Sequence, residues 1–163
     1  MKPVVRKAEM QDRESIHEAH MRSIREICVK DHGAEEISGW GFRDLGERWI
    51  EGIKNGLVWV VEYEGRVHGL ASIKFSGGDK SSHIQSLYLT PEVLGLGMGR
   101  KLMELMLDEA RERGVEVISL DSTITAHEFY RKFGFHDCGP VAKRPIGGVP
   151  VTSIPMQLDL TLG

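Results

Sequence analysis

The first segment whose residue types and spacing suggest a functional site is a glycine-rich run, Gly95-Leu96-Gly97-Met98-Gly99-Arg100. The run lies between a predicted strand that ends at Leu89 and a predicted helix that starts at Arg100. Glycine lets the backbone approach a ligand closely, in conformations that other residues avoid. The following helix offers unpaired N–H groups and the positive end of its dipole, and Arg100 adds a cation. The run therefore predicts a phosphate-binding loop.

Three classes of phosphate-binding protein carry a loop of this kind. The P-loop pattern GxxxxGK[ST] is absent from the chain. A Rossmann or methyltransferase reading is favoured by Asp121, which ends the next strand about 20 residues on, where a ribose-binding acid would lie. Two features oppose it. The segment from Thr90 to Leu94 separates the strand from the glycines, and the strands that precede the loop leave too little chain for a doubly wound sheet.

The third class rests on two motifs that occur in order. The segment 91–102, PEVLGLGMGRKL, resembles the acyl-coenzyme A signature of the GNAT superfamily of N-acetyltransferases, Gln/Arg-x-x-Gly-x-Gly/Ala, which follows a strand and opens a helix. The segment 126–135, AHEFYRKFGF, is similar to its second signature, A-x-x-F-Y-x-K-x-G-F. The order of the predicted elements also matches, so the resemblance covers nearly the whole chain, from Val4 to Leu160.

The resemblance implies an N-acetyltransferase that uses acetyl-CoA to acetylate a primary amine of a small molecule or peptide, by direct attack. It implies that the Leu89 N–H polarises the thioester carbonyl and that Tyr130 donates a proton to the departing thiolate. Acyl transfer needs such a donor where negative charge develops, and an acid for the leaving sulfur. The cofactor-binding residues that it implies are Leu87, Tyr88, Leu89, Leu94, Gly95, Leu96, Gly97, Met98, Gly99, Arg100 and Thr123.

The chain departs from the family pattern at three positions. Leu94 stands where Gln or Arg often precedes the glycines, and Thr123 replaces a frequent asparagine, whose contacts Ser122 or Thr123 would take over. Gln85 lies on the central strand where many members carry a glutamate used as base, and glutamine accepts no proton at neutral pH. The general base is therefore unassigned. This absence motivates an alternative from another class, a non-catalytic acyl-CoA-binding sensor or regulatory module.

Other polar and aromatic residues are weaker candidates. The alternation of a strand places His83 on one face with Gln85, Leu87 and Leu89, and a histidine pKa suits a base. We expect His17 and His20, on the first helix, to have surface or half-buried roles. Trp40, Trp49 and Phe42 either wall the acceptor pocket or belong to the core, where aromatic residues at helical spacing are common.

The elements that must position these residues follow from hydrophobic periodicity. The order of elements indicates a mixed α/β sheet, and the resemblance implies the fold class α/β (α+β): a GNAT-like, mostly antiparallel sheet with one parallel strand pair splayed at the cofactor site, flanked by about four helices. We expect a single acyl-CoA N-acetyltransferase domain over residues 1–163. The expected strands are 4–6, 57–63, 67–75, 83–89, 115–120 and 154–160. The expected helices are 12–30, 37–53 (interrupted by Gly39 and Gly41), 100–113 and 125–133.

The composition and net charge of the chain limit the classes of partner that it is expected to bind. The 163 residues carry 21 Lys and Arg against 24 Asp and Glu, a net charge of −3, which argues against a nucleic-acid partner. No apolar run has the length of a membrane span. Cys28 and Cys138 are too few and too far apart for a disulfide framework or a metal site, which favours the cytoplasm. The tail after Gly139 reads as a loop or hairpin that shapes the acceptor site or a homodimer contact, and the sequence leaves both open.

Overall fold

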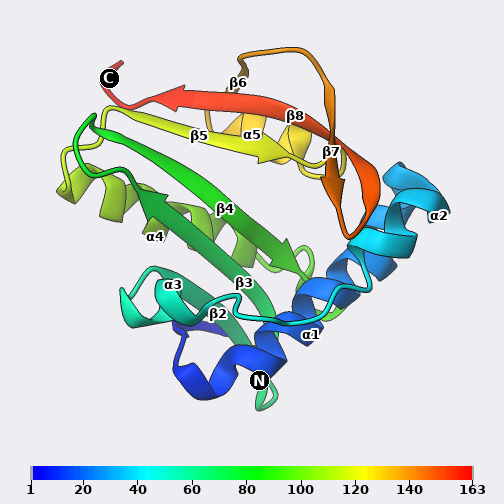
Figure 1. The fold of residues 1–163 in the computed structure, drawn as a ribbon. Coiled ribbons are helices and arrows are strands. Elements are labelled where there is room, and N and C mark those ends of the chain that lie inside the picture. The colour runs from blue at the N-terminus through cyan, green and yellow to red at the C-terminus, as the bar shows by residue number, and fades with distance from the viewer. Residues whose placement is uncertain (1, 163) are drawn as a thin grey trace.

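A mixed β-sheet organises the chain in the computed structural model, which describes residues 2–162 (Figure 1). Its strand order is β1-β2-β3-β4-β5-β8-β6, and β7 pairs with β8 as a hairpin. All neighbours are antiparallel except β4 and β5, which are parallel. The strands are β1 (Val4–Lys7), β2 (Val58–Tyr63), β3 (Arg66–Phe75), β4 (Ser81–Leu89), β5 (Val117–Ser122), β6 (His136–Asp137), β7 (Ala142–Ile146) and β8 (Val149–Asp159). This topology confirms the predicted fold class and excludes the doubly wound alternative.

The parallel pair separates part-way along its length. Register pairs run from Ser81 with Val117 to Ile84 with Leu120 and then stop, although β4 continues to Leu89. Figure 1 shows β4 and β5 diverging toward the helices at the right of the view. A parallel pair needs a crossover connection, and α4 (Met98–Glu112) supplies it. The glycine-rich run opens that helix, so the connection carries the candidate loop to the point where the strands part.

The helices cover both faces of the sheet. Their bounds are α1 (Arg13–Ser23), α2 (Val29–Trp40), α3 (Ile50–Lys54), α4 (Met98–Glu112) and α5 (His127–Lys132), with 3₁₀ turns at Met10–Asp12 and Pro91–Val93. Ile16 and Ala19 of α1 pack on one face of β2 and β3. Met103 and Met106 of α4 pack on the other face. Both sides of the sheet are therefore buried in this region, and each element has its apolar side turned inward.

The first helical region differs from its prediction. We expected one helix over 12–30 and a second over 37–53, but a π-helical turn at Ile24–Cys28 joins α1 to α2, which continues to Trp40. Gly33 adopts a φ of 81° inside α2 and kinks it. In the second region, residues 37–40 belong to α2 and Ile50–Lys54 forms α3, after Trp49, whose φ is 75°, while residues 41–49 are not helical. Hydrophobic spacing does not register an inserted residue in a helix, because apolar positions still recur at nearly the same intervals.

A bulge in β4 overturns the predicted alternation of its side chains. Ser72 pairs with Ser86 and Ile73 with Ile84, so Gln85 is an extra residue in the ladder. Beyond it, Leu87 and Leu89 pack on the same side as Ile84, in the cluster that contains α4. The prediction that His83 shares a face with these two leucines is therefore wrong. Because the bulge inserts one extra residue into the strand, the consecutive residues Gln85 and Ser86 both line a cavity on the α1 side of the sheet.

The tail after Gly139 forms the β7–β8 hairpin, which is one of the two forms expected for it. Gly147, in the turn of this hairpin, lies so close to Gly39 of α2 that neither position has room for a Cβ. Val149 and Val151 of β8 join Ile37 and Trp40 in a third apolar cluster. The hairpin therefore packs directly against α2.

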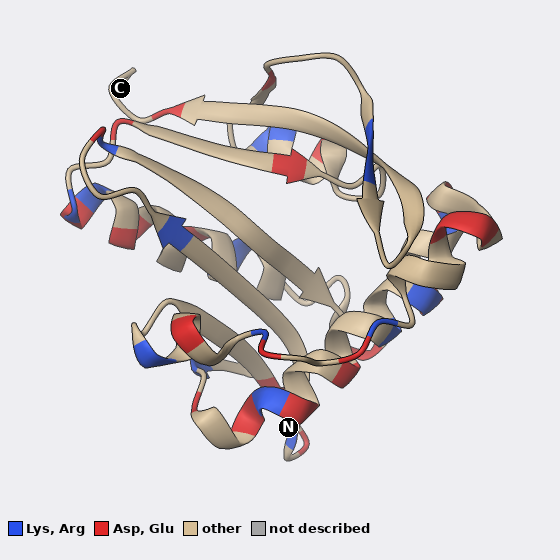
Figure 2. Ribbon diagram, viewed as in Figure 1, with Lys and Arg blue, Asp and Glu red and all other residues tan. Residues whose placement is uncertain are grey.

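Charged side chains are distributed without a dominant sign. Figure 2 shows basic and acidic positions interspersed along the helices rather than gathered on one face. Within residues 2–162, none of the helices has both the length and the apolar composition needed to cross a membrane. The same residues contain no group of three His, Cys, Asp or Glu side chains arranged to hold a metal ion.

We expect the pair between Arg6 and Asp12 to make stability depend on pH. Arg6 donates to both Asp12 carboxylate oxygens at 2.8 and 3.0 Å, and these bonds lower the pKa of Asp12. A carboxylate whose pKa is lowered by folding stabilises the protein above its unfolded pKa of about 3.9 and loses that contribution as the pH falls. Asp12→Asn should therefore cost about 1–2 kcal/mol at pH 7 and progressively less below about pH 4.

Urea unfolding of both proteins between pH 3 and pH 7 measures this difference. Asp108→Asn is the matched control, because Asp108 forms an exposed ion pair with Arg111 at 3.8 Å. Its free energy of unfolding should stay within about 0.5 kcal/mol of wild type. A difference between wild type and Asp12→Asn that did not change with pH would contradict the assignment.

Candidate active site

The glycine-rich run forms a loop with unpaired backbone donors. Gly95 and Gly97 have φ values of 75° and 80°, and a Cβ added to either would meet no atom within 4 Å. Within residues 2–162, the six backbone N–H groups from Gly95 to Arg100 donate to no acceptor, and the first such bond is that of Lys101 to the Gly97 C=O, at 3.1 Å. The loop therefore presents a row of free donors at the positive end of α4.

Arg100 lies at the rim of this loop. Its guanidinium lies 5.6 Å from the centre of the Phe133 ring and 3.8 Å from Glu104, in a pair whose two side chains are both largely exposed. Leu94 and Leu96 are also exposed beside it. The loop thus offers backbone donors flanked by a cation and two apolar side chains. That combination suits a ligand with both phosphate and hydrocarbon parts.

The end of β4 provides further unpaired donors at the splay. The Thr90 N–H donates to the His68 C=O at 2.8 Å, so it points toward β3. Successive N–H groups along a strand point to alternate edges. Those of Leu87 and Leu89 therefore point away from β3, toward the gap that β5 leaves after Ile84. They are placed where an extended ligand could take the position of a neighbouring strand.

A cavity of about 170 Å³ extends from this gap toward the glycine loop, and we call it the loop cavity. Its walls come from the π-helical turn and its neighbour in α1, from the end of β4, from the glycine loop and from α5. The lining residues are Ser23, Ile27, Cys28, Leu87, Tyr88, Leu89, Leu94, Gly99, Thr123, Thr125, Ala126 and Phe129. The lining is mainly apolar. Burial raises the pKa of Cys28 to about 11, so its thiol stays protonated at neutral pH.

Tyr130 lies at the inner end of the gap. It is buried on α5, where its ring packs edge-on against Phe129 and Phe135 at centroid distances of 5.5 and 5.8 Å. It lines a small cavity of about 20 Å³ between β4 and β5, the splay cavity, together with Leu87 and Asp121. Burial raises the pKa of the Tyr130 phenol, which keeps the hydroxyl protonated. The side chain can therefore donate a proton or a hydrogen bond at the splay.

Thr123 begins the turn into α5. Its Oγ1 accepts the Ala126 N–H at 3.0 Å, and its side chain lines both the loop cavity and the splay cavity. Ser122 donates to the Thr123 C=O at 2.7 Å. A hydroxyl therefore satisfies the donor at the entry of α5, and it lies beside the gap.

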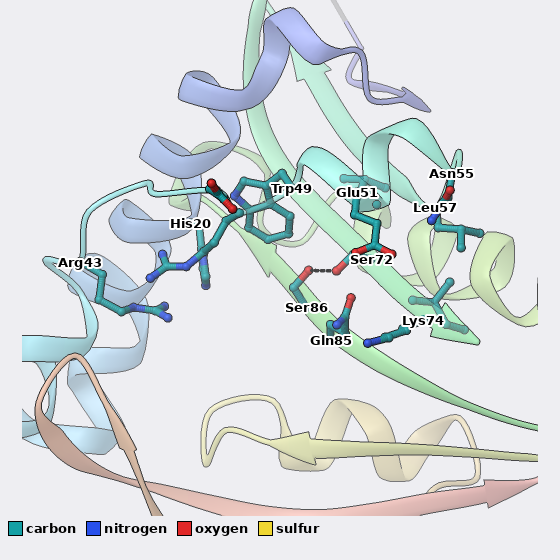
Figure 3. A pocket seen from close by; sticks show the side chains of 15 residues that line it. His20, Arg43, Trp49, Glu51, Asn55, Leu57, Ser72, Lys74, Gln85 and Ser86 are labelled. Carbon is teal, nitrogen blue, oxygen red and sulfur yellow. Dashed lines mark hydrogen bonds between the residues drawn. The ribbon is translucent and has the colours of Figure 1, made fainter. Parts of the chain in front are cut away.

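On the other side of β4, between α1 and α3, lies a cavity of about 400 Å³, the α1–α3 cavity (Figure 3). Ser72 and Ser86 share a hydrogen bond of 2.6 Å at its floor, and Gln85 lies beside them. Gln85 and Ser86 also line the splay cavity, which in turn shares Leu87 and Tyr88 with the loop cavity. The three cavities therefore lie next to one another along one stretch of β4 and share lining residues.

The weaker candidates divide between the site and the rest of the fold. Trp49 and His20 line the α1–α3 cavity, and His20 is buried, whereas a surface or half-buried role was expected for it. Trp40 belongs to the core, while Phe42 is 63% exposed beside Arg25. His83 lines none of the three cavities and accepts from or donates to Ser119 at 2.8 Å.

Sequence reasoning missed most of the walls on the α1 side. Arg43, Arg48 and Glu51 line the α1–α3 cavity, and Ile27 and Cys28 line the loop cavity. The arginines come from an irregular loop that has no motif, so no signal in the sequence could have singled them out. The lining of the loop cavity depends on the π-helical turn, which hydrophobic spacing does not reveal.

Comparison with known proteins assigns the family. Residues 28–160 match the model described as an acetyltransferase (GNAT) domain. The chain is 31% identical over 141 residues to the uncharacterized N-acetyltransferase YjgM of Escherichia coli (strain K12), covering 82% of this chain and 81% of the relative. Among solved structures, a GCN5-related N-acetyltransferase of Rhodopseudomonas palustris superposes with a TM-score of 0.82 at 23% identity, over 98% and 97% of the two chains.

A second structure carries the same fold with a ligand. The PaiA N-acetyltransferase of Thermoplasma acidophilum, solved in complex with coenzyme A, superposes with a TM-score of 0.76 at 18% identity, over 98% of this chain and 99% of that one. At these identities the two structures establish the fold, while the family model and the E. coli relative establish descent. The two signatures, the splayed parallel pair and these matches agree: this chain belongs to the GNAT family of acetyltransferases.

Proposed function

We propose that this chain, acting as one domain, transfers an acetyl group from acetyl-CoA to a primary amine of a small molecule or peptide. The observation that carries the proposal is the meeting of three features on β4. Free N–H groups on the glycine loop lie at one end, those of Leu87 and Leu89 lie at the splay, and the α1–α3 cavity opens on the other side. A donor and an acceptor of an acyl group can thus approach each other through the sheet.

The residues present suit coenzyme A. In the proposal, the backbone N–H groups from Gly95 to Arg100 bind the pyrophosphate, as helix N-termini bind anions. The unpaired N–H groups of Leu87 and Leu89 hold the amide-containing arm in the gap, and the apolar wall of the loop cavity covers it. Thr123 lies beside that arm. The PaiA structure contains coenzyme A, which supports this choice of cofactor for the shared fold.

Acetyl-CoA would supply the acetyl group as a thioester, activated for attack by an amine. The Leu89 N–H stabilises the negative charge that grows on the carbonyl oxygen, as a fixed dipole in a water-poor site. The Tyr130 hydroxyl gives its proton to the sulfur as the carbon–sulfur bond breaks. Direct attack needs no covalent enzyme intermediate, and the raised pKa of Cys28 agrees with a thiol that takes no part.

The amine occupies the α1–α3 cavity in this proposal, next to the Ser72–Ser86 pair. Gln85 can orient it by hydrogen bonding but cannot take its proton. His20, Glu47 and Glu51 line the same cavity. Burial lowers the pKa of His20 well below its usual range, so its imidazole is neutral at neutral pH and can hydrogen-bond to the amine. The general base stays unassigned, because Gln85 occupies the strand position commonly held by glutamate.

A thermal-shift experiment with acetyl-CoA, coenzyme A, S-adenosylmethionine and NAD tests the cofactor first. Saturating acetyl-CoA and coenzyme A should each raise the melting temperature by about 5–10 °C, and the other two should leave it unchanged. An amine screen read by released thiol then tests the transfer. No rise with acetyl-CoA would remove the basis of the proposal. Binding without thiol release for any amine would favour a non-catalytic acyl-CoA-binding module.

A further inference from the structure

The α1–α3 cavity contains two arginines that lack ionic partners. Arg43 and Arg48 line it from the loop between α2 and α3, and within residues 2–162 neither has a carboxylate oxygen within 4.0 Å. Arg6, Arg22 and Arg144, in contrast, each pair with a carboxylate at 2.7–2.8 Å. Two unpaired guanidinium groups in one cavity call for an explanation, because a partly buried cation without a partner is costly.

The loop that carries them is held in place from α1. Arg13 donates to the C=O groups of Gly46 and Arg48 at 2.7 and 3.1 Å, and His17 contacts the C=O of Arg43 at 2.9 Å. Arg43 itself donates its Nε to the Trp40 C=O at 2.9 Å, which leaves its terminal nitrogens free. Figure 3 shows Arg43 reaching into the cavity from this loop, with Glu51 on the opposite side. These hydrogen bonds fix the position of the loop that carries the two guanidinium groups.

Both arginines are partly withdrawn from water. Burial, together with the charge of Arg48, lowers the pKa of Arg43 to about 10. The Nη1 atom of Arg48 and the Nε1 atom of Trp49 are buried and have no hydrogen-bond partner within residues 2–162. Unpartnered buried donors are rare in folded proteins, because each leaves the cost of its desolvation uncompensated. Arg48 and Trp49 both line the α1–α3 cavity beside Arg43, so a ligand rich in acceptor atoms would find several donor groups there.

The acidic residues of the cavity do not serve as that partner. Glu47 and Glu51 also line it, but neither lies within 4.0 Å of a guanidinium nitrogen of Arg43 or Arg48. Lys74 contributes a third cation from β3. A molecule with an anionic group toward the arginines and an ammonium or amine group toward the carboxylates and β4 would satisfy both sets of charges.

We propose that the acceptor is an amine that also carries an oxyanion, a carboxylate or a phosphate, and that Arg43 and Arg48 bind this oxyanion in the α1–α3 cavity. The inference rests on the proposed acetyl transfer and names its substrate class. Guanidinium groups bind carboxylate and phosphate through paired, charge-assisted hydrogen bonds, which accounts for two arginines at this place.

Matched pairs of acceptors test the proposal, with thiol release as the readout. Each amino acid is compared with its amide, and each aminoalkyl phosphate with the corresponding amino alcohol. The anionic member should have a kcat/KM at least tenfold higher than its neutral partner. Which pairs show the preference distinguishes a carboxylate from a phosphate. Equal turnover of anionic and neutral members, or preference for the neutral ones, would overturn the inference while leaving acetyl transfer intact.

Variants then assign the preference to residues. Arg43→Gln and Arg48→Gln should each raise the KM for the anionic acceptor at least tenfold and erase the preference over the neutral partner, with the KM for acetyl-CoA unchanged. Arg111→Gln, on the exposed side of α4, is the control and should behave as wild type. An acetyl-CoA-induced rise in melting temperature shows that each variant is folded. Retention of the anionic preference in both variants would refute the role of the arginines, whereas absent acetyl-CoA binding in wild type would refute the proposed function instead.

Discussion

Gly97→Val is expected to weaken coenzyme A binding about 100-fold or more, equivalent to about 2.7 kcal/mol of binding free energy. Gly97 has a φ of 80° at the first turn of α4, a conformation that a β-branched residue strongly disfavours. Relaxing that strain rotates the N–H groups at the start of the helix away from a bound phosphate. The added side chain also occupies the open space above the loop, where a Cβ now meets no atom within 4 Å. Isothermal titration with coenzyme A measures the loss.

Gly114→Val separates backbone strain from ligand binding. Gly114 lies at the other end of the same helix, has a φ of 73°, and also faces open space. Both variants should lose a similar amount of stability, about 1–2 kcal/mol, because both place valine in a left-handed conformation. The Gly114 variant should bind coenzyme A as wild type does. If Gly97→Val retained wild-type affinity, the assignment of the glycine loop to the pyrophosphate would be wrong.

Tyr130→Phe is expected to lower kcat about 100-fold, with the dissociation constant of acetyl-CoA nearly unchanged. The substitution removes the hydroxyl that would protonate the leaving sulfur, and it keeps the ring that packs against Phe129 and Phe135. The loop proposed to bind the pyrophosphate lies on another element, so affinity should be retained. Because burial raises the pKa of Tyr130, the wild-type rate should show no loss from deprotonation of this group up to about pH 10. Steady-state rates across pH and titration with acetyl-CoA test both parts.

The other two tyrosines of the chain supply the comparison. Tyr63, at the end of β2, lines none of the three cavities, and Tyr63→Phe should leave kcat unchanged. Tyr88 is the competing candidate, because it is half-buried, lines the loop and splay cavities, and packs against His20 at a centroid distance of 4.4 Å. A large loss in Tyr88→Phe with full activity in Tyr130→Phe would move the role of acid to Tyr88.

The two signature segments show what can be predicted from consecutive residues alone. Glycines before a helix, and an aromatic pair at fixed spacing on the next helix, are properties of consecutive residues, so they can be read directly from the chain. The order of elements along the chain and the parallel pair followed from the same kind of evidence, since a strand–helix–strand unit of this length requires a parallel crossover. The predicted fold and family were both confirmed.

The faces of β4 show where local pattern fails. A strand alternates its side chains only while its ladder is regular, and one extra residue at Gln85 reverses every assignment beyond it. The sequence contains no glycine or proline at that point to mark the bulge. The π-helical turn at Ile24–Cys28 has the same character, because a single inserted residue changes which side chains reach the loop cavity.

The sequence by itself determined the parts of this protein that lie within continuous segments: the glycine-rich loop before α4, the tyrosine of α5, the order of strands and helices, and the family. Only the tertiary structure decided the cavity on the α1 side. Arg43 and Arg48 lie in a loop without regular periodicity, and they come to face Ser86 only because Arg13 and His17 hold that loop against α1. Contacts between residues so far apart in the chain depend on three-dimensional packing, and neighbouring residues leave no trace of them in the sequence.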